Sequence, residues 1–244
     1  MARMSCNVIS YTLKRTVNIE IVLPTVTIPE ALMNEGKVHH DYPAPFPVLY
    51  LLHGYGNNEK QWTGYSTVEL YAEERQIAVV MIAGENKFYL DSETDRFAAF
   101  IDNELHEFVT NTFPVSKKKE DTYIAGLSMG GFGALYHGLT HPELYQAIGA
   151  FSPAVKMQGV EVDLNRKIDE MDAIPNLYIA CGEDDFIYDD AKAFALCAKE
   201  KFQNVTWKSV PHFAHEWRFW DQQVEQFLDW LPRTDYYNDK KRSV

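Results

Sequence analysis

Residues 122–137 read TYIAGLSMGGFGALYH and contain the pattern GxSxG at residues 126–130. GxSxG alone is weak evidence, because chance alone places it in about one chain in ten to twenty of this length. Here it follows the apolar strand 122–127 and opens a helix predicted over 129–139, which stops before His141-Pro142. A strand, a tight turn and a helix in this order are what a nucleophile elbow requires. We therefore predict that Ser128 is a nucleophile, with the helix N-terminus facing any anion that forms there.

The chain around this elbow alternates between apolar strands and helices. The expected strands are 47–52 (PVLYLL), 77–83 (IAVVMIA), 122–127 (TYIAGL), 147–151 (AIGAF), 176–180 (NLYIA) and 205–210 (VTWKSV). Further helices are expected over about 97–113, 189–202 and 216–231. Most of these strands are apolar throughout, as expected when helices cover both faces of a sheet. The pattern predicts an α/β protein with a mostly parallel, doubly wound sheet.

Residues 1–244 are expected to form a single domain with three less regular segments. Residues 11–23 alternate in polarity and predict antiparallel edge strands, and residues 25–47 are rich in proline and predict a surface excursion. The polar stretch 161–174 is a candidate for a small cap over the site. The last residues, 233–244, form a polar tail that we expect to fray.

Composition narrows the function classes. The formal charge of −12 repels phosphate backbones and anionic lipid, so we expect neither nucleic acid nor a membrane surface as a partner. The three cysteines form no CxxC pair, and no apolar run is long enough for a signal peptide or a membrane span. These features favour a cytoplasmic protein.

A serine nucleophile needs a base, and the base needs a carboxylate to orient it. In this fold the chain order is serine, acid, histidine. Of the two histidines after the last strand, we favour His215 over His212, because His215 stands directly before the last helix. The acid belongs in the loop after 176–180, where position alone leaves the choice open among Glu183, Asp184, Asp185, Asp189 and Asp190.

An oxyanion needs two preorganised backbone donors. The N–H of Met129, directly after the nucleophile, is the first. The N–H of Tyr55, in the glycine-rich loop HGYGNN after strand 47–52, is the expected second. His53 in the same loop is interpreted as a structural residue. No set of side chains has the spacing of a known metal site, and the mechanism needs neither metal nor cofactor.

Five ordered blocks resemble one family. LLHGYGNN, MIAGENKFYLD, IAGLSMGGFGALYHGLTHPELY, CGEDDFIYDD and HEWRFWD are similar to the esterase-D or tributyrin-esterase type of α/β-hydrolase. That group is similar to the feruloyl and acetyl-xylan esterases of carbohydrate esterase family one and, more distantly, to S-formylglutathione hydrolases and mycolyltransferases. The resemblance covers about residues 11–232. It implies the α/β-hydrolase fold, with about eight strands and a small cap or none.

The resemblance also implies roles for particular residues. The family's acid ends a CGxxD pattern, which falls on Asp185, and its base is the histidine of an H-D/E-W pattern, which falls on His215. Its second oxyanion donor follows HG, which falls on Tyr55. The segment 25–47 is longer than such esterases usually need at that point.

Aromatic residues in these blocks are candidates for substrate contact. Trp62, Phe88 and Trp217 fall near the carboxyl edge of the expected sheet, although ordinary packing explains each of them equally well.

We therefore predict a serine carboxylesterase acting through an acyl-enzyme on short-chain acyl or small aromatic-acyl esters. Its partner would be the small-molecule ester, and a homo-oligomer stays open. The alternatives are a feruloyl or acetyl-sugar esterase, an S-formylglutathione hydrolase, an acyltransferase, or a non-catalytic binding protein on the same fold.

Overall fold

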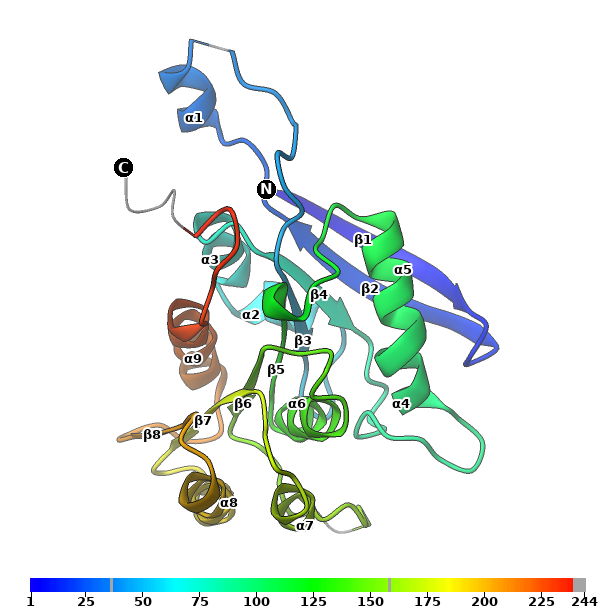
Figure 1. The fold of residues 1–244 in the computed structure, drawn as a ribbon, viewed down its shortest axis with the longest axis vertical. Helices are drawn as coiled ribbons and strands as arrows, with labels where there is room; N and C mark the ends of the chain where they lie inside the picture. Colours follow the sequence, from blue (N-terminus) through cyan, green and yellow to red (C-terminus); the bar gives the residue numbers. More distant parts are fainter. Residues whose placement is uncertain (36, 158, 239–244) are drawn as a thin grey trace.

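One eight-stranded sheet runs through the molecule (Figure 1). The structure is a computed structural model, and it describes residues 1–35, 37–157 and 159–238. The spatial order is β1-β2-β4-β3-β5-β6-β7-β8. Only the β1–β2 and β2–β4 pairs are antiparallel. The strands are β1 Ala2–Ser10, β2 Arg15–Leu23, β3 Val48–Leu52, β4 Ala78–Ile82, β5 Thr122–Leu127, β6 Ala147–Phe151, β7 Asn176–Gly182 and β8 Val205–Val210. The predicted mostly parallel sheet of an α/β-hydrolase is confirmed.

Helices cover both faces of this sheet (Figure 1). Helices α4 to α8 lie on one face, and α2, α3 and α9 lie on the other. Their bounds, with that of α1, are α1 Ile28–Met33, α2 Gln61–Tyr65, α3 Val68–Glu74, α4 Phe97–Ala99, α5 His106–Thr112, α6 Met129–Thr140, α7 Leu164–Asp169, α8 Tyr188–Lys201 and α9 Trp217–Trp230. A π-helical segment, η1 (Phe100–Leu105), joins α4 to α5, and a 3₁₀ turn, η2 (Lys119–Asp121), precedes β5.

The strand register aligns the loops that can carry a site. Leu52 at the end of β3 lies opposite Gly126 of β5, and Leu127 lies opposite Phe151 at the end of β6. Phe151 in turn lies opposite Ala180 of β7. Because ligands bind beyond the carboxyl ends of parallel strands, the loops after β3, β5, β6 and β7 face the same space.

The N-terminal hairpin differs from the prediction of strands within 11–23. The first strand lies earlier, at Ala2–Ser10, and residues 11–14 form the turn. Met4, Cys6 and Val8 alternate with exposed residues and pack against the core, so the strand signal was present in the sequence but fell outside the predicted range.

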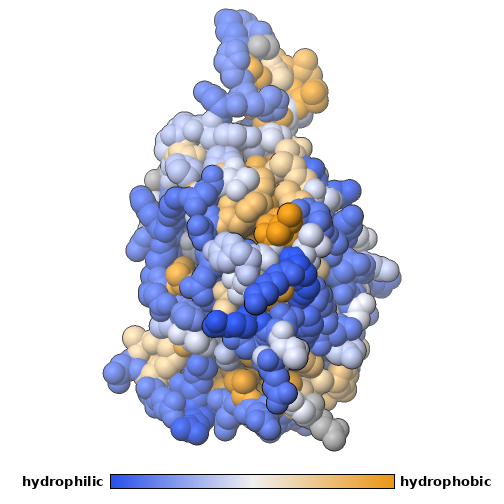
Figure 2. All heavy atoms as spheres, turned by 90° about the vertical axis from the view of Figure 1, so that its right-hand side faces the viewer, coloured by the Kyte–Doolittle hydropathy of each residue, from blue (hydrophilic) through white to orange (hydrophobic). Residues whose placement is uncertain are grey.

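The segment 25–47, which the sequence predicts to be a surface excursion, carries the short helix α1, which projects from the body (Figure 1). Thr27 and Glu30 close a capping box at its start. No residue of α1 is buried, and Ile28, Leu32 and Met33 are 75%, 75% and 79% exposed. Figure 2 shows apolar side chains gathered on one side of this projection, at the top of the view.

The candidate cap and the expected frayed tail are both corrected. Helix α7, within 161–174, lies in the helical layer, where Leu164 and Ile168 are buried and α7 contacts α6 and α8. The described part of the tail, residues 233–238, is also packed. The ring of Tyr237 stacks on Phe46 with centroids 4.7 Å apart, and its hydroxyl donates to the carbonyl of Ala44 at 2.6 Å. The packing and hydrogen bond of Tyr237 hold this segment against the body although most of its other residues are polar. Residues 239–244 of the predicted tail lie outside the described residues.

Candidate active site

Ser128 occupies a strained turn between β5 and α6. Its φ and ψ are 52° and −115°, a conformation that non-glycine residues rarely adopt. A Cβ on Gly126 would lie 2.3 Å from the carbonyl oxygen of Gly130, and a Cβ on Gly130 would lie 2.5 Å from that of Leu52. Only glycine fits at these two positions. The Ser128 N–H donates to the carbonyl of Phe151 at 2.9 Å, which fixes the turn to the neighbouring strand β6.

Three side chains from separate loops meet at this turn. The Nε2 atom of His215 lies 3.0 Å from the Ser128 hydroxyl oxygen. Its Nδ1 atom lies 2.9 and 3.0 Å from the two carboxylate oxygens of Asp185. Because an ionised carboxylate only accepts hydrogen bonds, Nδ1 carries the hydrogen and Nε2 is left as the acceptor for the serine proton. The arrangement can deprotonate a hydroxyl.

Of the five candidate carboxylates in this loop, Asp185 is the one that contacts His215. Its side chain is buried, whereas Asp184 is exposed and Glu183 accepts a hydrogen bond from Ser209. Asp189 and Asp190 lie in the first turn of α8. Burial opposes ionisation of Asp185, but hydrogen bonds from His215, Ser152 and the Ile187 N–H outweigh burial and hold its pKa below the ordinary value.

His212 is not part of this group. It is exposed and adopts a positive φ of 65° in the loop between β8 and α9. Of the two histidines in this loop, His215 is the one that lies against Ser128 and Asp185.

The two expected oxyanion donors belong to segments that adjoin Ser128. The Met129 N–H belongs to the first turn of α6, where backbone donors have no partner within the helix. Within residues 1–35, 37–157 and 159–238, the Tyr55 N–H has no hydrogen-bond acceptor. A Cβ on Gly54 would lie 3.4 Å from the Ser128 Cβ, so the Tyr55 loop passes directly beside Ser128.

The aromatic candidates separate into core and rim. The prediction of a substrate contact at Trp62 is wrong, because its side chain is 0% exposed and its indole N–H donates to the carbonyl of Leu52. Trp217 is partly exposed and stacks on Tyr65, with centroids 5.3 Å apart. Phe88 is also partly exposed and lies 6.3 Å from the ring of Tyr55. Trp217 and Phe88 remain predicted substrate contacts.

Two residues near the site were not predicted from the sequence. Ser152, at the end of β6, has a positive φ of 44°, hydrogen bonds to Asp185 and accepts from the indole N–H of Trp220. Phe186, next to Asp185, is 80% exposed, with its ring centroid 4.7 Å from that of His215. The rule that sites lie after the carboxyl ends of strands would have directed attention to both loops.

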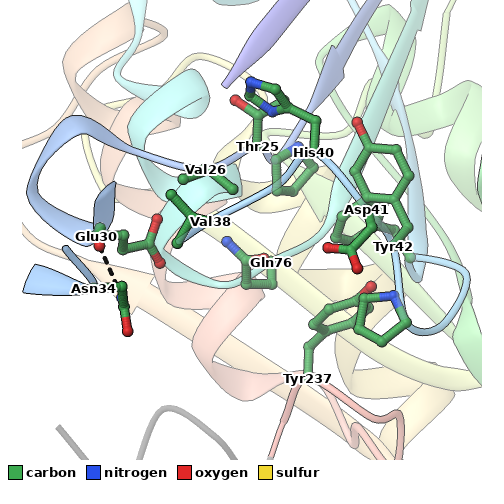
Figure 3. Close-up of a pocket in the computed structure, with 13 residues that line it drawn as sticks. Thr25, Val26, Glu30, Asn34, Val38, His40, Asp41, Tyr42, Gln76 and Tyr237 are labelled. Carbon is green, nitrogen blue, oxygen red and sulfur yellow. Dashed lines mark hydrogen bonds between the residues drawn. The ribbon is translucent and has the colours of Figure 1, made fainter. Parts of the chain in front are cut away.

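A cavity of about 200 Å³ lies away from this site, beneath the projecting segment 25–47 (Figure 3). Its lining includes Glu30, His40, Asp41, Gln76 and Tyr237. Among the described residues, no group of three or more His, Cys, Asp or Glu side chains could hold a metal ion. In the same part of the chain, every helix is too short or too polar to cross a membrane.

The sheet order and the serine elbow define an α/β-hydrolase. Residues 10–239 match the family model "Putative esterase", and the chain belongs to this esterase family. It is a carboxylic ester hydrolase.

Known relatives agree with this placement. An acetyl esterase of Caldicellulosiruptor saccharolyticus is 31% identical over 271 residues, which cover 96% of this chain and 99% of the relative. An S-formylglutathione hydrolase of Staphylococcus aureus has a similar structure, with a TM-score of 0.77 and 25% identity over 94% of this chain and 98% of that one. A ferulic acid esterase shares the fold, with a TM-score of 0.79 and 20% identity over 94% and 96% of the two chains.

Proposed function

We propose that this enzyme is a serine carboxylesterase that uses Ser128, His215 and Asp185 as a catalytic triad. The observation that carries the proposal is the continuous contact from Asp185 through His215 to Ser128, with distances of 2.9 and 3.0 Å. In acyl transfer the carboxylate orients the imidazole and the imidazole takes the serine proton, so the three groups must be in contact in this order.

The reaction follows from which atoms face one another. The Ser128 oxygen attacks the ester carbonyl while Nε2 of His215 takes its proton. The carbonyl oxygen becomes an oxyanion and accepts hydrogen bonds from the N–H groups of Met129 and Tyr55. His215 then returns the proton to the alcohol oxygen, the C–O bond breaks and the acyl group stays on Ser128. A water molecule repeats these steps, releasing the acid and restoring the serine.

Short-chain acyl or small aromatic-acyl esters are the proposed substrates. The similarity to an acetyl esterase supports a small acyl group. Two exposed aromatic residues, Phe186 with its ring against His215 and Tyr55 in the loop beside Ser128, support apolar groups on the substrate. A panel of p-nitrophenyl esters from acetate to octanoate, with methyl ferulate and acetylated xylan, tests the proposal. Highest kcat/KM on octanoate would contradict it.

S-formylglutathione hydrolase is the second candidate, because a solved structure with that activity covers almost the whole chain. An S-formylglutathione hydrolase would turn over its thioester far faster than p-nitrophenyl acetate, so adding S-formylglutathione to the panel decides between them. A pre-steady-state burst of p-nitrophenol equal to the enzyme concentration would contradict the non-catalytic alternative.

The three cysteines are free thiols. We propose a cytoplasmic location on that basis, since reduced cysteines suit a reducing compartment. A homo-oligomer remains a prediction, which sedimentation of the purified enzyme would test.

Phe186 is expected to set the preference for the leaving alcohol. His215 must reach the alcohol oxygen to protonate it, so the alcohol substituent lies beside the His215 ring, which Phe186 contacts. Phe186→Ala should lower kcat/KM for phenyl and naphthyl acetates about three- to tenfold, the size of one lost aromatic contact. Methyl and ethyl acetates should change less than about twofold. Phe186→Trp, which keeps an aromatic ring, is the matched control. Equal losses on all four esters would contradict a role in alcohol preference.

The pH dependence should follow the state of His215. Protonated imidazole cannot accept the Ser128 proton, so kcat/KM should fall on the acid side of the pH profile. The pKa of Asp185 is lower than usual, against its burial, because of hydrogen bonds from His215, Ser152 and the Ile187 N–H. Asp185 therefore stays ionised there, and the acid limb should fit one ionisation, with log(kcat/KM) falling with a slope of about one. A slope of two would contradict this assignment.

A further inference from the structure

The loop after β4, residues 83–90, holds unusual strain. Glu85, Asn86, Phe88 and Tyr89 all adopt positive φ, between 48° and 60°. Non-glycine residues keep such angles only where the surrounding structure fixes them. The contacts of this loop therefore indicate which part of the molecule it holds in place.

Tyr89 lies at the centre of this loop in a slot shaped for its ring. Its side chain is 0% exposed. A Cβ added to Gly84, or to Gly133 of α6, would lie 2.6 Å from the Tyr89 ring. The Tyr89 hydroxyl donates to the carbonyl oxygen of His53 at 2.8 Å. The buried ring thus delivers one hydrogen bond to the loop that contains Tyr55.

Two further bonds join these loops. The Gly84 N–H donates to Nε2 of His53 at 2.7 Å, and the Gly56 N–H donates to the side-chain oxygen of Asn86 at 2.7 Å. His53 and Gly56 are the residues on either side of Gly54 and Tyr55. Residues 84–89 therefore hold the loop on both sides of Tyr55, whose N–H has no hydrogen-bond acceptor among the described residues.

A buried histidine–carboxylate pair, His137 and Asp102, contacts the backbone of Tyr89. His137 of α6 is 0% exposed, with Nε2 2.9 Å from the carbonyl oxygen of Tyr89 and Nδ1 2.7 Å from a carboxylate oxygen of Asp102. A carbonyl oxygen only accepts, so Nε2 carries a hydrogen, and one more proton is shared between Nδ1 and Asp102. Asp102 lies in the π-helical segment η1, a local geometry that often occurs at functional sites.

We propose that Tyr89 is a positioning residue for the oxyanion-binding N–H of Tyr55, fixed in turn by His137 and Asp102. The inference rests on the proposed esterase mechanism and deepens it. Oxyanion donors act only within a narrow range of distance from the developing charge, so a small displacement of the Tyr55 loop costs transition-state binding. Ground-state binding of the ester does not depend on that bond.

Tyr89→Phe removes the hydroxyl and keeps the ring in its slot. We expect kcat to fall about 10- to 100-fold, less than the loss from removing an oxyanion donor outright, with KM changed less than about twofold. The matched control is Tyr123→Phe, since Tyr123 is also fully buried and donates to a backbone carbonyl, that of Glu120, at the opposite end of β5. The control should lose a similar few degrees of melting temperature and keep its kcat.

A tetrahedral boronate adduct separates positioning from general loosening. An alkylboronic acid bound to Ser128 places a boronate oxygen where the oxyanion forms, so its inhibition constant should rise in Tyr89→Phe by about the factor that kcat/KM loses. Asn86 is exposed, and Asn86→Gly removes the side-chain oxygen that accepts from the Gly56 N–H. Glycine tolerates the positive φ at residue 86. The variant should shift kcat and boronate affinity in the same direction by a smaller factor.

The results that would contradict the positioning role differ from those that would contradict the proposed esterase mechanism. Wild-type kcat in Tyr89→Phe, unchanged boronate affinity beside reduced kcat, or an equal loss in Tyr123→Phe would each overturn the positioning role. Full activity in Ser128→Ala, or a wild-type enzyme insensitive to the boronic acid, would instead overturn the proposed function itself.

Discussion

Ser128→Ala should lower kcat on a short-chain ester by about 10⁵- to 10⁶-fold, the size of loss seen when a serine hydrolase loses its nucleophile. The expected cause is the loss of the covalent step, because no other hydroxyl lies against His215 Nε2 among the described hydrogen bonds. The side chain of Ser128 forms no cap on α6, so its removal should leave the fold intact. Steady-state kinetics on p-nitrophenyl acetate and a thermal melt provide the measurements.

Ser5→Ala is a suitable control for this experiment. Ser5 lies on the edge strand β1, far along the sheet from β5, and its hydroxyl donates to Glu20. It should retain wild-type kcat. If a clean preparation of Ser128→Ala kept more than about a hundredth of the wild-type rate, Ser128 would not be the nucleophile.

The central strands and the elbow could be predicted because their signals are local. Strands β5, β6 and β8 begin and end at the residues that the sequence predicts, and β5 and β6 coincide with apolar runs. The elbow needs glycine where two backbones nearly touch, so Gly126 and Gly130 record a three-dimensional contact directly in the sequence. Features of this kind can be predicted from the sequence alone.

Other features depend on which surfaces meet, and a linear pattern does not carry that information. Trp62 belongs to a block next to the site, yet its ring turns inward to pack against Phe151 and Trp217. Tyr237 is buried within an otherwise polar tail because Phe46, distant in sequence, offers a ring to stack on. The braces on the Tyr55 loop are equally non-local, since they come from the loop after β4.

Sequence position does not distinguish Asp184 from Asp185 as the acid of the candidate triad, because the two residues are adjacent. Position alone left both open, and the resemblance to esterases indicated Asp185. The structure distinguishes them by direction: Asp185 is buried against His215, and Asp184 is exposed to solvent. Adjacent residues after a strand point to different sides, so only one of the pair can orient the imidazole.

Asp185→Asn should therefore lower kcat by about 10⁴-fold, as an equivalent change does in a protease triad. The amide keeps the shape of the carboxylate but can donate to Nδ1 of His215, which favours the tautomer with hydrogen on Nε2. That tautomer cannot accept the Ser128 proton. Asp184→Asn is the matched control, and as an exposed substitution it should change kcat less than about twofold. Both variants are compared by kcat and KM on one short-chain ester.

The reaction of Ser128 with a fluorophosphonate separates the two ways in which Asp185→Asn could fail. A wrong tautomer should slow labelling and ester hydrolysis together, because both steps need His215 as a base, and the melting temperature should stay within a few degrees of wild type. A large fall in melting temperature would mean that Asp185 chiefly stabilises its loop through the Ile187 N–H. A dead Asp184→Asn beside an active Asp185→Asn would move the acid to its neighbour and leave the serine mechanism standing.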